Sequence, residues 1–188
     1  MPHLINISTL GRPELQPYRT LRRSQDHIDQ GIFVAEGEKV VRRLLNSPVD
    51  AVSFLITHEW YGILSEEEER FRGCTADVFV ADKKLLEKIV GYRLHQGIMA
   101  VSKVPHQPDL PELVGTLPRP FLMVALDGLM NSENVGVLVR NCAGFGVAAL
   151  LVGETSSSPY LRRAVRNSMG AVFHLPVVHT WSLAAALQ

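Results

Sequence analysis

The chain has 188 residues, of which 46% are hydrophobic and 20% charged, with no formal net charge and an isoelectric point near 7.1. This balance is typical of a globular protein and allows a core for one large domain or two small ones. The sequence has no apolar run near the roughly 20 residues of a membrane span, and its start does not resemble a secretory signal. Two cysteines are too few for a disulfide framework, so we expect a reducing, cytoplasmic setting.

The histidine and charge patterns narrow the classes of ligand. The seven histidines show no metal-ligand spacing, so no metal site is expected. The zero net charge gives no overall preference for nucleic acid, although arginines cluster locally, and each cluster fits a solvated face equally well. The clusters are Arg12, Arg19, Arg22 and Arg23; Arg42 and Arg43; and Arg162, Arg163 and Arg166.

Helical and strand patterns alternate through the first hundred residues, which predicts a small α/β sandwich. Strands are predicted at 31–35, 52–56, 78–80 and 98–101. Helices are predicted at 14–29, with Ile28 among its apolar positions; after Glu36–Glu38, with Val40, Val41, Leu44 and Leu45 on one face; around an exposed acidic run, Glu66–Glu69; and from the cap Asp82 to Val90. We assign Glu36 and Glu38 to capping.

A proline-rich segment then marks a domain boundary. Residues 103–120 contain five prolines, a density that favours extended, semi-rigid chain. The predicted organisation is a first domain at 1–103, a linker at 104–119 that holds one short helix within 109–117, and a second domain at 120–188.

The second domain begins as a βαβ unit. The apolar run Phe121–Leu126 predicts a strand buried on both faces, and Val147–Val152 predicts the next strand. A helix that begins at Ser156–Pro159, a strand at 172–178 and a last helix capped by Thr180 or Ser182 should follow. Three parallel strands leave a sheet edge uncovered, so either a partner covers it or the sequence is a piece of a longer protein, and we favour the second.

Arg140 stands out in the helix between these two strands. The apolar stripe of that helix is Val135, Leu138, Val139 and Cys142, and Arg140 lies on the opposite side, one turn after Gly136. Because helical side chains lean toward the N-terminus, its guanidinium should reach back toward Asn134, near the strand ends where open α/β sheets bind ligands. Spacing alone also fits a surface arginine and an N-capping asparagine.

These residues resemble the SpoU/TrmH branch of the SPOUT RNA methyltransferases. The segment Asn131–Gly146 is similar to the family's first motif, with Asn134, Gly136 and Arg140 at its fixed positions. The segment Arg166–Ala171 is similar to its Ser-x-Gly-Ala segment. Residues 31–41 and 97–101 resemble the ribosomal-protein-like substrate domain that often precedes it. Glu133 and Val137 depart mildly from the family pattern, and the later motifs would lie beyond Gln188.

The resemblance implies a knotted, parallel-sheet α/β enzyme that transfers a methyl group from S-adenosylmethionine to a ribose 2′-hydroxyl of tRNA or rRNA. It implies catalytic roles for Arg140 and Asn134. A guanidinium is a poor general base, so Arg140 would steer the phosphate and the 2′-hydroxyl. Substrate contacts would come from Arg22, Arg23, Lys39, Arg166 and Ser168, although Ser168 fits a structural turn equally well. The cofactor residues are expected beyond Gln188, and the family implies a homodimer.

The alternative from another class is a non-catalytic RNA-binding module, or an inactive piece without the cofactor pocket. A Rossmann nucleotide enzyme is disfavoured because no GxGxxG turn follows a strand; Gly144 and Gly146 end a helix instead. The sequence does not identify the RNA or the modified nucleotide.

Overall fold

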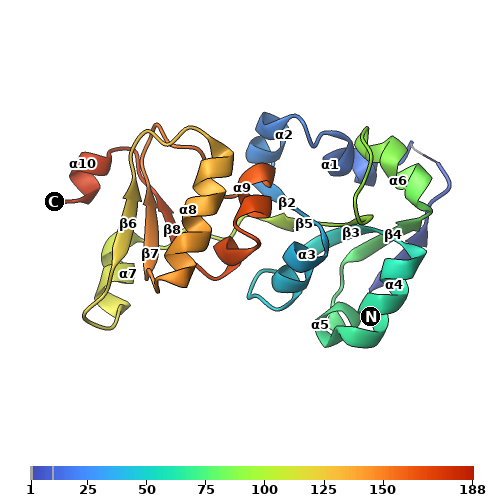
Figure 1. The fold of residues 1–188 in the computed structure, drawn as a ribbon, viewed down its shortest axis with the longest axis horizontal. Helices are drawn as coiled ribbons and strands as arrows, with labels where there is room; N and C mark the ends of the chain where they lie inside the picture. The colour runs from blue at the N-terminus through green and yellow to red at the C-terminus, as the bar shows by residue number, and fades with distance from the viewer. Residues whose placement is uncertain (1, 10) are drawn as a thin grey trace. The chain divides into compact units, whose positions relative to one another are not determined.

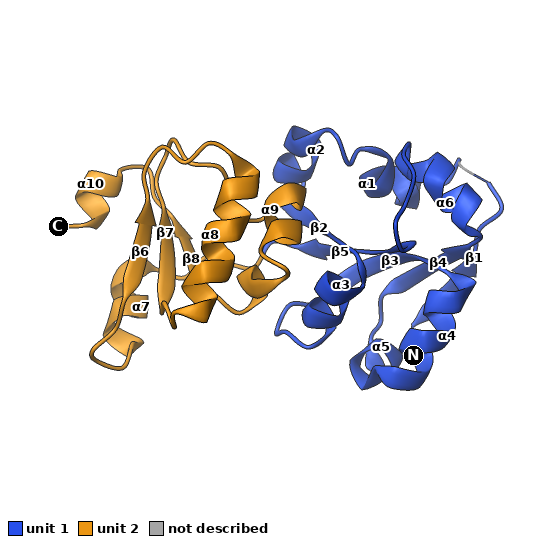
Figure 2. Cartoon of the chain, viewed as in Figure 1, with its two compact units in different colours: residues 1–104 blue, residues 105–188 orange. Residues whose placement is uncertain are grey.

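The computed structural model describes residues 2–9 and 11–188, and the chain divides into two compact units. Unit 1 is residues 1–104 and unit 2 is residues 105–188 (Figure 2). Each unit contains its own sheet.

Unit 1 is built on a five-stranded mixed sheet with the order β1-β4-β3-β5-β2. The strands are β1 (His3–Asn6), β2 (Ile32–Glu36), β3 (Ala51–Thr57), β4 (Asp77–Ala81) and β5 (Ile98–Lys103). β1, β4 and β3 are parallel, whereas β5 runs antiparallel to its neighbours β3 and β2. Four of these strands were predicted; β1 was not, because its four residues show no buried alternation.

Helices cover both faces of this sheet (Figure 1). One face carries α1 (Gln16–Arg19), α2 (Ser24–Asp29) and α6 (Lys83–Val90), and the short η1 (Pro13–Leu15) precedes α1. The other face carries α3 (Glu38–Leu45), α4 (His58–Glu67) and α5 (Glu69–Gly73). Successive strand residues therefore enter two cores: Leu55 and Phe79 pack with α1 and α6, while Phe54 meets Phe71 of α5 edge-to-face at 5.1 Å between ring centroids.

Two helices predicted in unit 1 are interrupted. The helix predicted at 14–29 breaks after Arg19, where the Arg23 N–H donates to the Thr20 carbonyl at 2.7 Å, and Ile28 is 50% exposed instead of buried. The acidic run predicted as exposed breaks at Glu68, whose side chain is only 13% exposed because it pairs with Arg42. The prediction for α3 is confirmed, since its four apolar residues are all buried.

Unit 2 has a three-stranded parallel sheet with the order β6-β7-β8. Its strands are β6 (Met123–Leu126), β7 (Ala149–Val152) and β8 (Val177–His179). Its helices are α7 (Leu110–Thr116), α8 (Ser132–Gly144), α9 (Arg162–Asn167), η2 (Ala171–Phe173) and α10 (Leu183–Ala186). The proline-rich segment belongs to this unit, because the Gln107 side chain bonds both the N–H and the carbonyl of His179 in β8.

Unit 2 corrects three local predictions. β6 is an edge strand with Ala125 exposed, not a strand buried on both faces; the fully buried strand is the central β7. α9 begins at Arg162 and not at the serines, because Ser158 accepts from the Tyr160 N–H and forms a turn. The segment 172–178 is mostly not strand, because Gly170 takes a left-handed conformation at φ 82° and the 3₁₀ turn η2 follows it.

Capping side chains define several of the remaining helix starts, of which the cap at Asp82 was predicted and the cap at Asp109 was not. Asp82 accepts from the Leu85 N–H at 2.8 Å, and Asp109 accepts from the Glu112 N–H at 3.1 Å. Of the two residues proposed to cap α10, Ser182 does so.

We predict that Tyr18→Phe will destabilise unit 1. The Tyr18 hydroxyl and the Ser53 Oγ form a buried hydrogen bond of 2.9 Å, and its loss leaves a buried serine without this partner, at a cost of about 1–2 kcal/mol. Urea denaturation followed by circular dichroism measures the change. The double variant Tyr18→Phe with Ser53→Ala removes both polar groups and should recover part of the loss; a double variant as unstable as the sum of the singles would contradict the pairing.

Candidate functional site

The start of α8 is fixed by the side chain of Asn131 and by Ser156 and Ser157, of which Ser157 donates to the Met130 carbonyl. The Asn131 side-chain oxygen accepts from the N–H groups of Glu133 at 2.8 Å and Asn134 at 3.1 Å, so Asn131 is the cap. Ser156 Oγ donates to the Leu126 carbonyl and accepts from the Leu129 N–H, both at 3.1 Å. Asn134 is therefore not the capping residue, and its side chain lies exposed in the first turn of α8.

Gly136 is the point of closest approach between α8 and α9. A Cβ atom at this position would lie 2.4 Å from the Ala164 carbonyl oxygen and 2.8 Å from the Asn167 Cβ. No side chain fits there without moving the α9 backbone. The glycine of the motif is thus explained by helix packing, and not by a turn or by contact with a ligand.

The contact at Gly136 also brings polar groups of the two helices together. Arg163 Nη1 lies 3.3 Å from Glu133 Oε1, and the Asn167 side-chain amide donates to the Glu133 carbonyl at 3.4 Å. The sequence analysis gave no role to Glu133 or Asn167. The sequence signal for this contact is residue spacing. Glu133 and Gly136 are three residues apart on one helix, and Arg163 and Asn167 are four apart on the other, so each pair shares one helix face.

Arg140 lies one turn beyond Gly136 on α8 and is exposed. At about 1.5 Å of rise per residue, its Cα is about 12 Å along the helix axis from the start of α8. Arg166, in the last turn of α9, is also exposed. Asn134, Arg140 and Arg166 therefore present an amide and two guanidinium groups to solvent from the two helices that meet at Gly136.

Ser168 has a different environment from these residues. It is fully buried, its Oγ donates to the Val165 carbonyl at 2.8 Å, and it accepts from the Gly170 N–H at 3.2 Å. Both bonds close the turn after α9. Of the two alternatives left open by the sequence, the geometry favours the structural turn over a contact with substrate.

Two buried ionisable residues of unit 2, Cys142 in α8 and Tyr160 just before α9, also have a structural role. Burial raises the pKa of the Cys142 thiol, and it raises the pKa of Tyr160 to about 12. Both groups therefore remain protonated at neutral pH. Neither has the depressed pKa of an activated nucleophile.

The residues proposed to bind substrate in unit 1 do not converge. Arg22 and Arg23 are exposed in the turn between α1 and α2, whereas Lys39 is exposed in the first turn of α3. These helices cover opposite faces of the sheet (Figure 1). Arg22, Arg23 and Lys39 therefore do not form a single patch in the structure.

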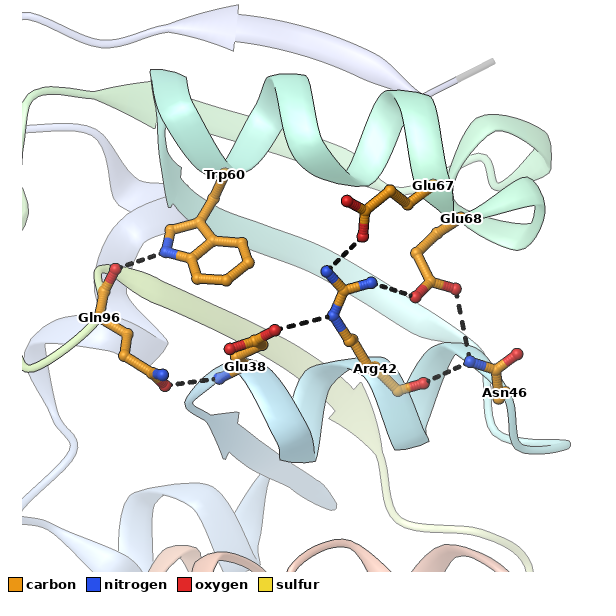
Figure 3. Close-up of polar contacts among 7 residues, drawn as sticks. All are labelled: Glu38, Arg42, Asn46, Trp60, Glu67, Glu68 and Gln96. Carbon is orange, nitrogen blue, oxygen red and sulfur yellow. Dashed lines mark hydrogen bonds and ion pairs between the residues drawn. The ribbon is translucent and has the colours of Figure 1, made fainter.

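The α3 start is instead organised by side chains distant in sequence (Figure 3). Gln96 Oε1 accepts from the Glu38 N–H at 2.8 Å, so the Gln96 side chain caps the start of α3. The Gln96 carbonyl accepts from Trp60 Nε1 at 2.6 Å. One residue thereby joins α3, α4 and the loop that leads to β5.

Arg42 ties α3 to α4 and α5 through carboxylates (Figure 3). Its guanidinium lies 2.6 Å from Glu67 Oε2, 2.7 Å from Glu68 Oε1 and 3.2 Å from Glu38 Oε1. Hydrogen bonds to Glu67 and Glu68 raise the pKa of Arg42. Arg42 belongs to one of the arginine clusters found in the sequence. Its guanidinium is engaged in ion pairs within unit 1.

Two adjacent cavities open at the carboxyl ends of β3 and β4. One of about 470 Å³ is lined by Thr57, His58, Glu59, Trp60, Ala81, Asp82, Lys83, His95 and Gln96. The other, of about 480 Å³, is lined by Asn6, Ile7, Ser8, His58, Val80, Ala81, Asp82, Lys84, Leu85 and Lys88. The sequence analysis named none of these residues as a site.

Two classes of site are not seen within the described part of the chain. Residues 2–9 and 11–188 contain no group of three or more His, Cys, Asp or Glu side chains placed to hold a metal ion. None of the helices in those residues has the length and apolar character needed to cross a bilayer.

Comparison with known proteins finds a family model that matches most of unit 2. Residues 121–188 match the model of the SpoU rRNA Methylase family. A Mycobacterium bovis protein named as an uncharacterized tRNA/rRNA methyltransferase is 29% identical over 168 residues, which cover 87% of this chain and 56% of that relative. The chain thus spans about half the length of the curated relatives it matches.

Solved structures share the fold of nearly the whole chain. An AdoMet-bound rRNA methyltransferase from Sinorhizobium meliloti superposes with a TM-score of 0.77 at 19% identity, covering 94% of this chain and 64% of that one. An RNA 2′-O ribose methyltransferase superposes with a TM-score of 0.69 at 22% identity, covering 97% and 68%. At these identities the likeness concerns the α/β fold.

We predict that Gly136→Ala will destabilise unit 2 by about 2–3 kcal/mol, because the added methyl group overlaps the α9 backbone. Hydrogen exchange of the β7 amides measures the effect. Gly144→Ala is the matched control: it lies in the same helix with nothing within 4 Å of its Cβ, and alanine favours helix. Equal protection of β7 in both variants would show that the contact does not require glycine.

Proposed function

We propose, from the membership of residues 121–188 in the SpoU rRNA methylase family, that this chain acts as an RNA methyltransferase. The reaction would transfer a methyl group from S-adenosylmethionine to a ribose 2′-hydroxyl of tRNA or rRNA. The observation that carries the proposal is that the motif residues Asn134 and Arg140 lie exposed on α8, on either side of its close contact with α9. The fold shared with a solved RNA 2′-O ribose methyltransferase supports the ribose as target.

The exposed cations of α8 and α9 suit the RNA backbone. A guanidinium binds a phosphate through paired N–H donors and stays protonated, so Arg140 would hold the phosphate next to the target ribose and orient the 2′-hydroxyl. A ribose hydroxyl is a weak nucleophile, so orientation makes up much of what a protein can contribute. Arg166 would contact a neighbouring phosphate, and the Asn134 amide would bind a substrate hydroxyl or phosphate oxygen.

The same residues fit the RNA and do not fit the cofactor. S-adenosylmethionine, when bound, supplies the methyl group from a positively charged sulfonium. Arg140 and Arg166 would repel that charge, whereas they attract phosphate. We therefore assign no cofactor contact to α8 or α9.

Assembly of two copies through unit 2 is part of the proposal. Leu122, Val137 and Phe145 are 55%, 50% and 82% exposed, which is unusual for large apolar residues. A second copy would cover such a surface. Sedimentation of the complete protein measures the state directly.

We predict that Arg140→Ala in the complete protein will reduce methyl transfer at least 100-fold, because the phosphate loses its bidentate partner. Transfer of labelled methyl groups to RNA measures turnover, and calorimetry with S-adenosylmethionine should show cofactor binding within about twofold of the original. Arg140→Lys keeps the positive charge but lacks the paired N–H donors of the guanidinium, so it should recover only part of the rate.

Mass-spectrometric mapping of 2′-O-methyl sites in RNA from cells with and without the gene identifies the product. Loss of one 2′-O-methyl nucleotide is the expected result. Unchanged turnover in Arg140→Ala would contradict the catalytic role. RNA binding without any methyl transfer would contradict the proposed enzyme activity and favour the alternative, a non-catalytic RNA-binding module.

A further inference from the structure

The two cavities of unit 1 are neighbours, and together they are called the recess. They share His58, Ala81 and Asp82, which follow the carboxyl ends of β3 and β4. Each volume, about 470 and 480 Å³, lies within the range of about 300–1,000 Å³ that ligand pockets occupy. The recess belongs entirely to unit 1, and none of its residues has a role in the methyl transfer proposed above.

Hydrogen bonds fix the walls of the first cavity. Trp60 is only partly buried, and its indole N–H is bonded to the Gln96 carbonyl at 2.6 Å, so the ring is held in one orientation (Figure 3). Lys83 Nζ donates to the His95 carbonyl at 3.1 Å, which ties α6 to the same loop. A recess whose aromatic side chain is already held in place loses little entropy when it binds a ligand.

Gly97 makes this arrangement possible. It has φ +70°, and a Cβ atom there would lie 2.8 Å from Thr57 Cγ2. Its carbonyl accepts from the Thr57 N–H at 3.1 Å. The loop carrying His95 and Gln96 can therefore lie directly against the start of α4.

The two cavities differ in chemistry. The first combines Trp60 with hydrogen-bonding groups of Gln96 and Glu59, a set that suits the flat face and polar edge of a nucleobase. The second is lined by Lys84 and Lys88, which are exposed four residues apart on α6 and so lie on the same side of that helix. Asp82 lines both cavities, and its carboxylate already accepts a hydrogen bond from the Leu85 N–H.

The geometry points to a binding site for an unpaired nucleotide of the substrate RNA, with its base against Trp60 and its flanking phosphates on Lys84 and Lys88. This inference rests on the proposed function, because it takes the ligand to be the RNA that is methylated. A single-stranded segment is required, since a base within a duplex cannot expose its face to an aromatic side chain.

Trp60 fluorescence tests the inference on the 188-residue chain. The chain has two tryptophans, and Trp181 is 97% exposed, so Trp181→Phe leaves Trp60 as the only reporter. Titration with a single-stranded RNA oligonucleotide should quench this fluorescence, whereas a duplex of the same sequence should not. Adenosine and uridine monophosphate are the probes for a free nucleotide.

Three variants locate the contacts. Trp60→Ala should weaken binding of the single strand by about 5- to 100-fold, the range for loss of one stacked base. Lys84→Ala with Lys88→Ala, both exposed and so without effect on folding, should weaken it at least fivefold and lower the slope of log affinity against log salt by about 1.4. Lys103→Ala, at an exposed position outside the recess, is the control and should bind as the original does.

Each outcome decides the inference. Quenching by the single strand that Lys84→Ala with Lys88→Ala weakens supports it. RNA binding without quenching and without an effect of the two lysines overturns it, as does the absence of RNA binding. Mononucleotide binding as tight as that of the oligonucleotide would make the recess a site for a free nucleotide. Quenching by RNA in a complete protein that transfers no methyl group would retain this site and remove the proposed function.

Discussion

The packing of α8 against α9 depends on the missing side chain at Gly136, and the rest of unit 2 depends on that packing. With a Cβ only 2.4 Å from the Ala164 carbonyl, any other residue would separate the helices. Their contact allows Glu133 to pair with Arg163, and it buries Ala164 and Val165 completely. It also sets where the exposed Asn134 and Arg140 stand in relation to α9. A requirement of packing therefore determines the geometry of the proposed substrate surface.

Unit 1 joins its helices in a different way from unit 2. Its sheet is covered on both faces, so its apolar residues are used in two cores, and a polar network joins the helices that cover one of those faces (Figures 1 and 3). Gln96 bonds α3 and Trp60 at once, while Arg42 gathers Glu38, Glu67 and Glu68. This network has three carboxylates for one guanidinium, so it offers no positive charge to an anionic ligand. Exposed cations of unit 1 lie elsewhere, among them Lys84 and Lys88 of α6.

The proposed action on RNA does not require a net positive charge on the whole chain. Arg163 is paired with one carboxylate, Glu133, and Arg42 is surrounded by three carboxylates, so neither guanidinium adds positive charge to its surroundings. Among the exposed cations, Arg140 lies on the same helix as Asn134, and Lys84 and Lys88 line the cavity next to that of Trp60. Recognition would then depend on the position of a few cations and not on a broad basic surface.

The sequence by itself determined the alternation of helices and strands, the buried face of α3, the cap at Asp82, and the match of residues 121–188 to the SpoU family model. These features are local, because helix and strand periodicity and capping act within a few residues. Only the tertiary structure showed that Gln96 caps α3 from 58 residues away, that Ser168 is enclosed in a turn, and that Gly136 faces the α9 backbone. Those contacts join segments distant in the chain, and their partners are chosen by how the helices pack on each sheet, which no local pattern encodes.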